Sequence, residues 1–167
     1  SLEMGGKNAQ IIMADADLNL ALEGSVWGAF GTTGQRCTAT SRIFLEKKIF
    51  NSFCKDLVKR AKKIRIGAGL NPRTEMGPVI NETQRNGIHS YVTSGIEEGA
   101  RLECGGRFAK VPGLSHGYFY EPTVFTHANS KMKIVREEIF GPVVCLLPVK
   151  DLEDAIHQAN DTNYGLS

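Results

Sequence analysis

The sequence lacks the patterns that mark several classes of protein. Its 167 residues contain no apolar run long enough to span a membrane and no signal-peptide pattern. The net charge is only +2, and most basic residues are interleaved with acidic ones, so nothing indicates a nucleic-acid partner. The four histidines are scattered, which argues against a metal site. A Gly-x-Gly-x-x-Gly motif, which would hold the pyrophosphate of a dinucleotide, is also missing.

Cysteine is scarce, and its spacing excludes the common cysteine frameworks. Cys37, Cys54, Cys104 and Cys145 form neither a Cys-x-x-Cys pair nor a zinc-binding pattern, which favours reduced thiols in a cytoplasmic setting. The last three have apolar neighbours and are expected in the core. Cys37 instead follows Arg36 in a stretch of glycine and threonine, and a neighbouring cation favours a reactive thiolate. A small buried thiol remains the alternative for Cys37.

The order of apolar segments predicts an α/β fold in one domain. Hydrophobic residues make up 41% and charged residues 23% of the chain, as in ordinary globular domains. Short apolar runs alternate with segments of helical periodicity, which predicts an open, mainly parallel sheet with helices on both faces. The expected strands are 9–13, 41–46, 101–104, 119–125 and 143–149. The expected helices are 49–64, 81–99, 152–160 and one beginning at Asp15 or Asp17 and ending at Phe30, with a single helical turn at 131–135.

Two segments near the N-terminus resemble the active-site signatures of the NAD(P)-dependent aldehyde dehydrogenase superfamily. One is the stretch Glu3-Met4-Gly5-Gly6-Lys7, and the other runs from Phe30 through Gly34-Gln35-Arg36 to Cys37. The resemblance implies that the Cys37 thiolate attacks an aldehyde to give a thiohemiacetal and then a thioester. It also implies that Glu3 is the general base that activates the hydrolytic water, a role that needs partial burial. Without that resemblance, Glu3 would be read as a surface charge.

A third segment, Arg136-Glu137-Glu138-Ile139-Phe140-Gly141-Pro142, also matches the family. Taken alone it would be a charged turn. The resemblance implies that Glu138 accepts hydrogen bonds from the nicotinamide ribose and that Phe140 packs near the nicotinamide, while Gly5 lets the backbone turn beneath it. The resemblance therefore implies NAD or NADP as the cofactor, a choice left open because no residue here matches those that meet the adenosine ribose.

The resemblance also sets the expected domain organisation. Residues 1–167 match the catalytic domain, without the cofactor domain that precedes it or the C-terminal oligomerisation segment. We therefore expect a piece of a longer chain, which the resemblance implies is a homodimer or homotetramer. A non-enzymatic binding or structural module on the same fold is the alternative. A cysteine hydrolase is more remote, because it would need a histidine near Cys37.

Two residues beside the nucleophile are the candidates for substrate contacts. Arg36 and Thr38 flank Cys37 and are expected to line the aldehyde pocket. The stretch 35–42 resembles the branch of the family that acts on semialdehydes with a carboxylate tail, and an arginine could pair with that carboxylate. Equally, Arg36 could face its own loop.

Overall fold

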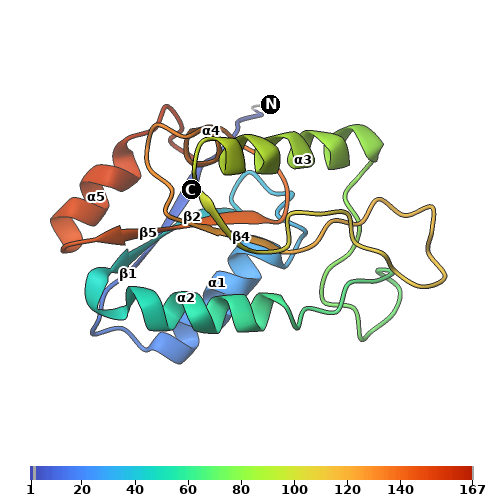
Figure 1. Cartoon of the computed structure of the whole chain (residues 1–167), viewed down its shortest axis with the longest axis horizontal. Helices are drawn as coiled ribbons and strands as arrows, with labels where there is room; N and C mark the ends of the chain where they lie inside the picture. Colours follow the sequence, from blue (N-terminus) through green and yellow to red (C-terminus); the bar gives the residue numbers. More distant parts are fainter. Residues whose placement is uncertain (2, 167) are drawn as a thin grey trace.

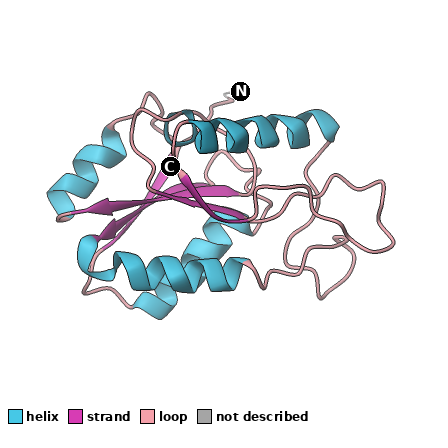
Figure 2. Ribbon diagram, in the orientation of Figure 1, coloured by secondary structure: helices cyan, strands magenta, loops and turns pink. Residues whose placement is uncertain are grey.

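A computed structural model describes residue 1 and residues 3–166 of the chain. Within this part, five strands form a single sheet in the order β1-β2-β5-β4-β3 (Figures 1 and 2). Three neighbouring pairs are parallel, and only β3 and β4 pair antiparallel. The predicted open, mainly parallel sheet is thus confirmed. The strands are β1 Asn8–Ile12, β2 Thr40–Glu46, β3 Arg101–Cys104, β4 Thr123–Thr126 and β5 Val143–Val149.

Helices cover both faces of the sheet, as Figures 1 and 2 show. Their first turns have capping side chains where the sequence offers them: Asp17, Asn81 and Asp151 each accept hydrogen bonds from main-chain N–H groups of the helix that follows. One face carries α1 Leu18–Phe30 and α2 Lys47–Ala61, and the other carries α3 Glu82–Glu97, α4 Lys133–Arg136 and α5 Leu152–Asn160.

The sheet, with β5 at its centre and β2 beside it, divides the core into two clusters, one on each face. Successive side chains of a strand point to opposite faces. Accordingly, Ile43 and Leu45 of β2 pack with the cluster under α1 and α2, whereas Phe44 packs with the cluster under α3 and α4. Six of the seven residues of β5 are buried. Such a continuous apolar run is typical of a parallel strand covered on both faces.

Several predicted boundaries differ from the structure. The strand predicted at 119–125 is confined to β4, because Pro122 has no N–H to donate to the sheet. Before it, Tyr120 makes only an isolated bridge to Phe108. Helix α2 covers Lys47–Ala61 rather than 49–64, and α4 begins at Lys133 rather than 131. Helix ends are the part of an element that local sequence defines least.

Candidate active site

Cys37 lies in the loop that joins α1 to β2. Two consecutive residues of this loop, Thr33 and Gly34, have left-handed backbone angles, with φ of 57° and 65°. A Cβ atom at Gly34 would overlap the carbonyl of Gly141, so glycine is required both for the angle and for the contact. Gln35 anchors the loop from the other side, because its Oε1 accepts the N–H of Ile80 at 2.9 Å. The nucleophile loop is therefore held at two points by distant parts of the chain.

The four cysteines have different environments. All are free thiols, and Cys37 is half-buried while the other three are buried. Burial raises the pKa of Cys54 to about 12 and that of Cys104 and Cys145 to about 11, which keeps these thiols neutral at physiological pH. The prediction that these three belong to the core is confirmed. Cys37 is thus the most accessible thiol of the four.

The glycine pair of the first motif contacts the glutamate of the third. The N–H of Gly6 donates to Oε1 of Glu138 at 2.8 Å, across 132 residues of sequence. A Cβ at Gly5 would lie 2.7 Å from Oε2 of the same carboxylate and 3.0 Å from the ring of Tyr164. A side chain at Gly5 would therefore push Glu138 away. Oε2 accepts no hydrogen bond from the described residues and is available to a ligand.

Asn8 connects the first motif to the nucleophile, and sequence reasoning missed it. Its Nδ2 donates to the carbonyl of Cys37 at 2.5 Å and to that of Ala39 at 3.3 Å. A Cβ at Gly6 would overlap the same Cys37 carbonyl. The only signal in the sequence is a polar residue that begins an otherwise apolar strand, directly after the motif.

Phe140 has an unusual backbone conformation. Its φ is 54°, which is rare for a residue with a bulky side chain and is often found at functional sites. The side-chain amide of Gln84 holds this turn by donating to the carbonyls of Ile139 and Phe140, both at 3.0 Å. The Phe140 side chain is 38% exposed and borders a small pocket that Gly6, Gly34 and Glu138 also line. The pocket lies where the three motifs meet.

The two predicted substrate residues lie in different surroundings. Thr38 is exposed. The guanidinium carbon of Arg36 lies 5.8 Å from the ring centroid of Trp27 on α1, so Arg36 faces a neighbouring helix rather than only its own loop. No carboxylate of the described residues forms an ion pair with it, and its Nε is buried without an acceptor there. Arg36 therefore keeps a positive charge beside Cys37 that these residues do not neutralise.

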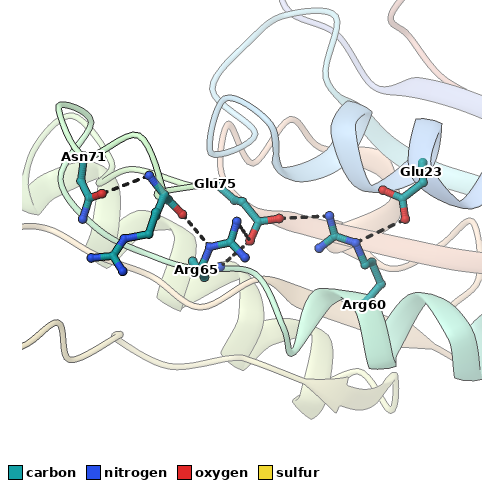
Figure 3. Close-up of polar contacts among 6 residues, drawn as sticks. Glu23, Arg60, Arg65, Asn71 and Glu75 are labelled. Atoms are coloured by element: carbon teal, nitrogen blue, oxygen red, sulfur yellow. Dashed lines mark hydrogen bonds and ion pairs between the residues drawn. The ribbon is translucent and has the colours of Figure 1, made fainter.

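An ion-pair network supports the helix that ends in the nucleophile loop. Figure 3 shows Arg60 of α2 between Glu23 of α1 and Glu75. The guanidinium nitrogens of Arg60 lie 3.3 Å from a carboxylate oxygen of Glu23 and 3.0 Å from one of Glu75. Glu75 also accepts the N–H of Arg65, and this bond together with the nearby guanidinium groups holds its pKa below the usual range. Glu23, Arg60 and Glu75 border a second pocket at the end of α1, together with Trp27, which is 61% exposed.

Glu3 lies exposed, three residues before Gly6. The described residues provide it with neither an ion pair nor a hydrogen bond. The partial burial expected of a general base is thus not supplied by this part of the chain. The structure brings Cys37, Gly5, Glu138 and Phe140 toward one site, whereas none of the described contacts connects Glu3 to it.

Two buried cationic side chains, Lys7 and Arg42, lie next to the glycine pair. Arg42 donates to the carbonyl of Lys7 through Nε, at 3.0 Å, and through Nη2, at 2.6 Å, and Nη2 also reaches the carbonyl of Ala159 at the end of α5. The amine of Lys7 has no hydrogen-bond partner among the described residues. Burial is the main cause that lowers the pKa of Lys7 to about 8.

Comparison with known proteins identifies the family. The model of the aldehyde dehydrogenase family matches residues 1–167. The chain belongs to the aldehyde dehydrogenase family. Its fold is that of known family structures: a betaine aldehyde dehydrogenase from Staphylococcus aureus, solved in complex with NAD+, superimposes with a TM-score of 0.96 at 44% identity. HpcC from Thermus thermophilus superimposes with a TM-score of 0.93 at 47% identity.

The family members that this chain resembles are much longer than the chain itself. The betaine aldehyde dehydrogenase of Bacillus subtilis strain 168 is 47% identical over 167 residues, which is all of this chain and 34% of that protein. The structural matches cover 98% and 97% of this chain and 32% of each solved one. The chain therefore spans about a third of the length of these relatives.

Two further findings concern the described residues alone. None of their helices combines the length and the apolar character that crossing a membrane requires. Among them, no three His, Cys, Asp or Glu side chains are grouped as a metal site would require.

Proposed function

We propose that this chain is the catalytic domain of an NAD(P)-dependent aldehyde dehydrogenase and works as one part of a longer polypeptide. The supporting observation is the convergence of three sequence motifs. The Gly6 N–H reaches Glu138, and Asn8 reaches the carbonyl of Cys37. A chain that used the fold only as a scaffold would not need these contacts, which join the first motif both to Glu138 and to the nucleophile loop.

In the proposed reaction, the Cys37 thiolate attacks the aldehyde carbon. A C–S bond forms and the carbonyl electrons move to oxygen, which gives a thiohemiacetal. The cofactor, when bound, supplies the acceptor for the hydride that leaves this carbon. The oxygen then re-forms a carbonyl, and Cys37 holds the acyl group as a thioester. Glu3 takes a proton from water, the water oxygen attacks the thioester, and the C–S bond breaks to release the acid and the thiolate.

Glu138 suits the proposed contact with the nicotinamide ribose. One carboxylate oxygen is fixed by Gly6, and the other is left to accept a hydroxyl. The missing side chain at Gly5 leaves room directly beside it. Phe140, half-exposed on the same pocket, would pack against the bound group. The NAD+ complex of the Staphylococcus aureus relative favours NAD over NADP.

For the substrate, we propose an aldehyde with an anionic tail, such as a semialdehyde. The support is Arg36, whose charge the described residues do not neutralise and whose Nε lacks an acceptor. The relatives from Bacillus subtilis and Staphylococcus aureus are named for betaine aldehyde, which carries a fixed positive charge. Arg36 would repel the cationic betaine aldehyde, and its guanidinium already occupies the face of Trp27 to which a cation could bind. Comparing kcat/KM for succinic semialdehyde and betaine aldehyde tests this proposal, and a preference for the cation would contradict it.

Hydride transfer and hydrolysis can be separated in the full-length protein by Glu3→Gln. This variant should release one equivalent of NADH in a burst and then stall, because the thioester cannot be hydrolysed. Glu97→Gln, which changes an exposed carboxylate on α3, is the matched control and should turn over normally. Normal steady-state turnover in Glu3→Gln would rule out its role as the base. Cys37→Ser should give neither burst nor turnover.

The exposure of Glu3 is the one observation that favours a catalytically silent module. We propose instead that the rest of the longer chain covers Glu3 and supplies the cofactor's pyrophosphate contacts. The 167 residues alone should then produce no measurable NADH or NADPH from simple aldehydes or semialdehydes. Robust turnover that depends on Cys37 would show that the site needs much less protein than proposed.

The proposed setting of the full-length enzyme follows from the same family. Four free cysteines suit a reducing cytoplasm. We propose a homodimer or homotetramer, which light scattering on the full-length protein would test.

A further inference from the structure

We propose that Asn8 is a positioning residue that fixes the main chain of the nucleophile. This inference rests on the proposed function of Cys37. Asn8 touches none of the reacting atoms and acts through the peptide group that follows Cys37.

The side-chain amide of Asn8 holds two carbonyls at once. Nδ2 donates to Cys37 at 2.5 Å and to Ala39 at 3.3 Å, so the two bonds lie on either side of the exposed Thr38. Within the same turn, the N–H of Ala39 donates to the carbonyl of Arg36 at 3.0 Å. Both partners of the amide are acceptors, so only its NH₂ group can serve them. The oxygen of the amide is buried without a partner among the described residues, as expected if the amide is oriented by its donors.

The strand pairing places Asn8 at this position. Asn8 pairs with Thr40, but the next residue, Ala9, pairs with Arg42, so β2 carries one extra residue here. An irregularity of this kind bends the strand and is common beside active sites. The extra residue is Ser41, whose hydroxyl donates to the carbonyl of Asn8 at 3.2 Å. The main chain of Asn8 is thus held from β2 while its side chain reaches back to Cys37.

Fixing the Cys37 carbonyl restricts the nucleophile itself. The carbonyl lies between the Asn8 amide and Gly6, where even a Cβ atom would overlap it. Because the peptide group is planar and includes the Cα of Cys37, fixing this carbonyl also fixes the Cα from which the sulfur-bearing side chain projects. Misplacing a reacting atom by about 1 Å can cost about 100-fold in rate. Asn8 therefore favours the reactive placement of the sulfur.

The test compares Asn8→Ala and Asn8→Asp in the full-length enzyme. Asn8→Asp keeps the shape but replaces the NH₂ donor with an acceptor. We expect both to lower kcat by about 10- to 100-fold, with less than a threefold change in the KM for NAD+. Asn86→Ala, on the exposed face of α3, is the matched control and should leave both constants unchanged. A kcat within twofold of the parent in either folded variant would overturn the proposal, and so would a loss confined to KM.

A second measurement distinguishes positioning from general loosening of the fold. In the full-length enzyme, Asn8→Ala should change the rate of Cys37 alkylation while the buried Cys54 and Cys145 stay unlabelled. Labelling of all these cysteines would mean that Asn8 only stabilises the fold, and the proposal would fail. Turnover in Cys37→Ser would instead contradict the proposed function. Inactive Cys37→Ser together with unaltered Asn8→Ala would reject the positioning role alone.

Discussion

Selective alkylation of Cys37 follows from the burial of the other three cysteines. Their raised pKa values, about 11 for Cys104 and Cys145 and about 12 for Cys54, leave about one thiol in 1,000 to 10,000 as thiolate at pH 8. An ordinary exposed thiol, with a pKa of about 8.5, is about one quarter thiolate at that pH. Thiolate content alone therefore slows the buried cysteines at least about 100-fold, and restricted access slows them further.

The assay is a time course of iodoacetamide labelling of the folded 167-residue chain, followed by peptide mass spectrometry. Cys37 should be the first cysteine modified, and Cys37→Ser should remove the fast phase. In denaturant all four thiols should react at similar rates, which controls for local sequence effects. Labelling of a buried cysteine as fast as Cys37 in the folded chain would refute the reasoning.

Two further predictions concern stability. Gly34→Ala should lower the free energy of unfolding by about 1 to 3 kcal/mol, because Gly34 has a φ of 65° and an added Cβ would overlap the Gly141 carbonyl. Gly87→Ala in α3 meets no atom within 4 Å and should instead raise it by about 0.5 to 1 kcal/mol; equal urea midpoints for the two variants would contradict the structure. Burial lowers the pKa of Lys7 from 10.5 to about 8, so the folded state loses this proton at a lower pH than the unfolded state does. The free energy of unfolding should therefore rise by up to about 3 kcal/mol as the pH increases from 8 to 10.5. Lys7→Met should lack that gain, and a stability difference between wild type and variant that stays constant from pH 8 to 10.5 would contradict it.

Much of the fold could be predicted because local sequence determines it. The apolar run 143–149 is buried on both sides and became the central strand β5. Asp151 precedes a helical pattern and caps α5. The strand predicted at 119–125 begins only at Thr123 in the structure, because Pro122 limits pairing before it. Strand β3 was predicted with the correct bounds, but its antiparallel pairing was not, because pairing direction depends on the long connection between strands rather than on their composition.

The motifs indicated which residues belong to the candidate site, but they could not show how those residues meet. The contact between Gly6 and Glu138 spans 132 residues, and the one between Asn8 and Cys37 spans 29. Such contacts depend on which strands become neighbours in the sheet. The left-handed angle of Phe140 is likewise imposed by the fold, because no local pattern favours it at a bulky residue.

The most direct test of the account is the covalent state of Cys37 during turnover. The full-length Glu3→Gln variant should be mixed with NAD+ and a semialdehyde, quenched in acid after the NADH burst and digested for mass spectrometry. We expect the acyl group of the substrate as a thioester on the peptide that contains Cys37, and no adduct when NAD+ is omitted and the thiohemiacetal dissociates on quenching. NADH formation with Cys37 unmodified, or with the acyl group on another residue, would contradict the account.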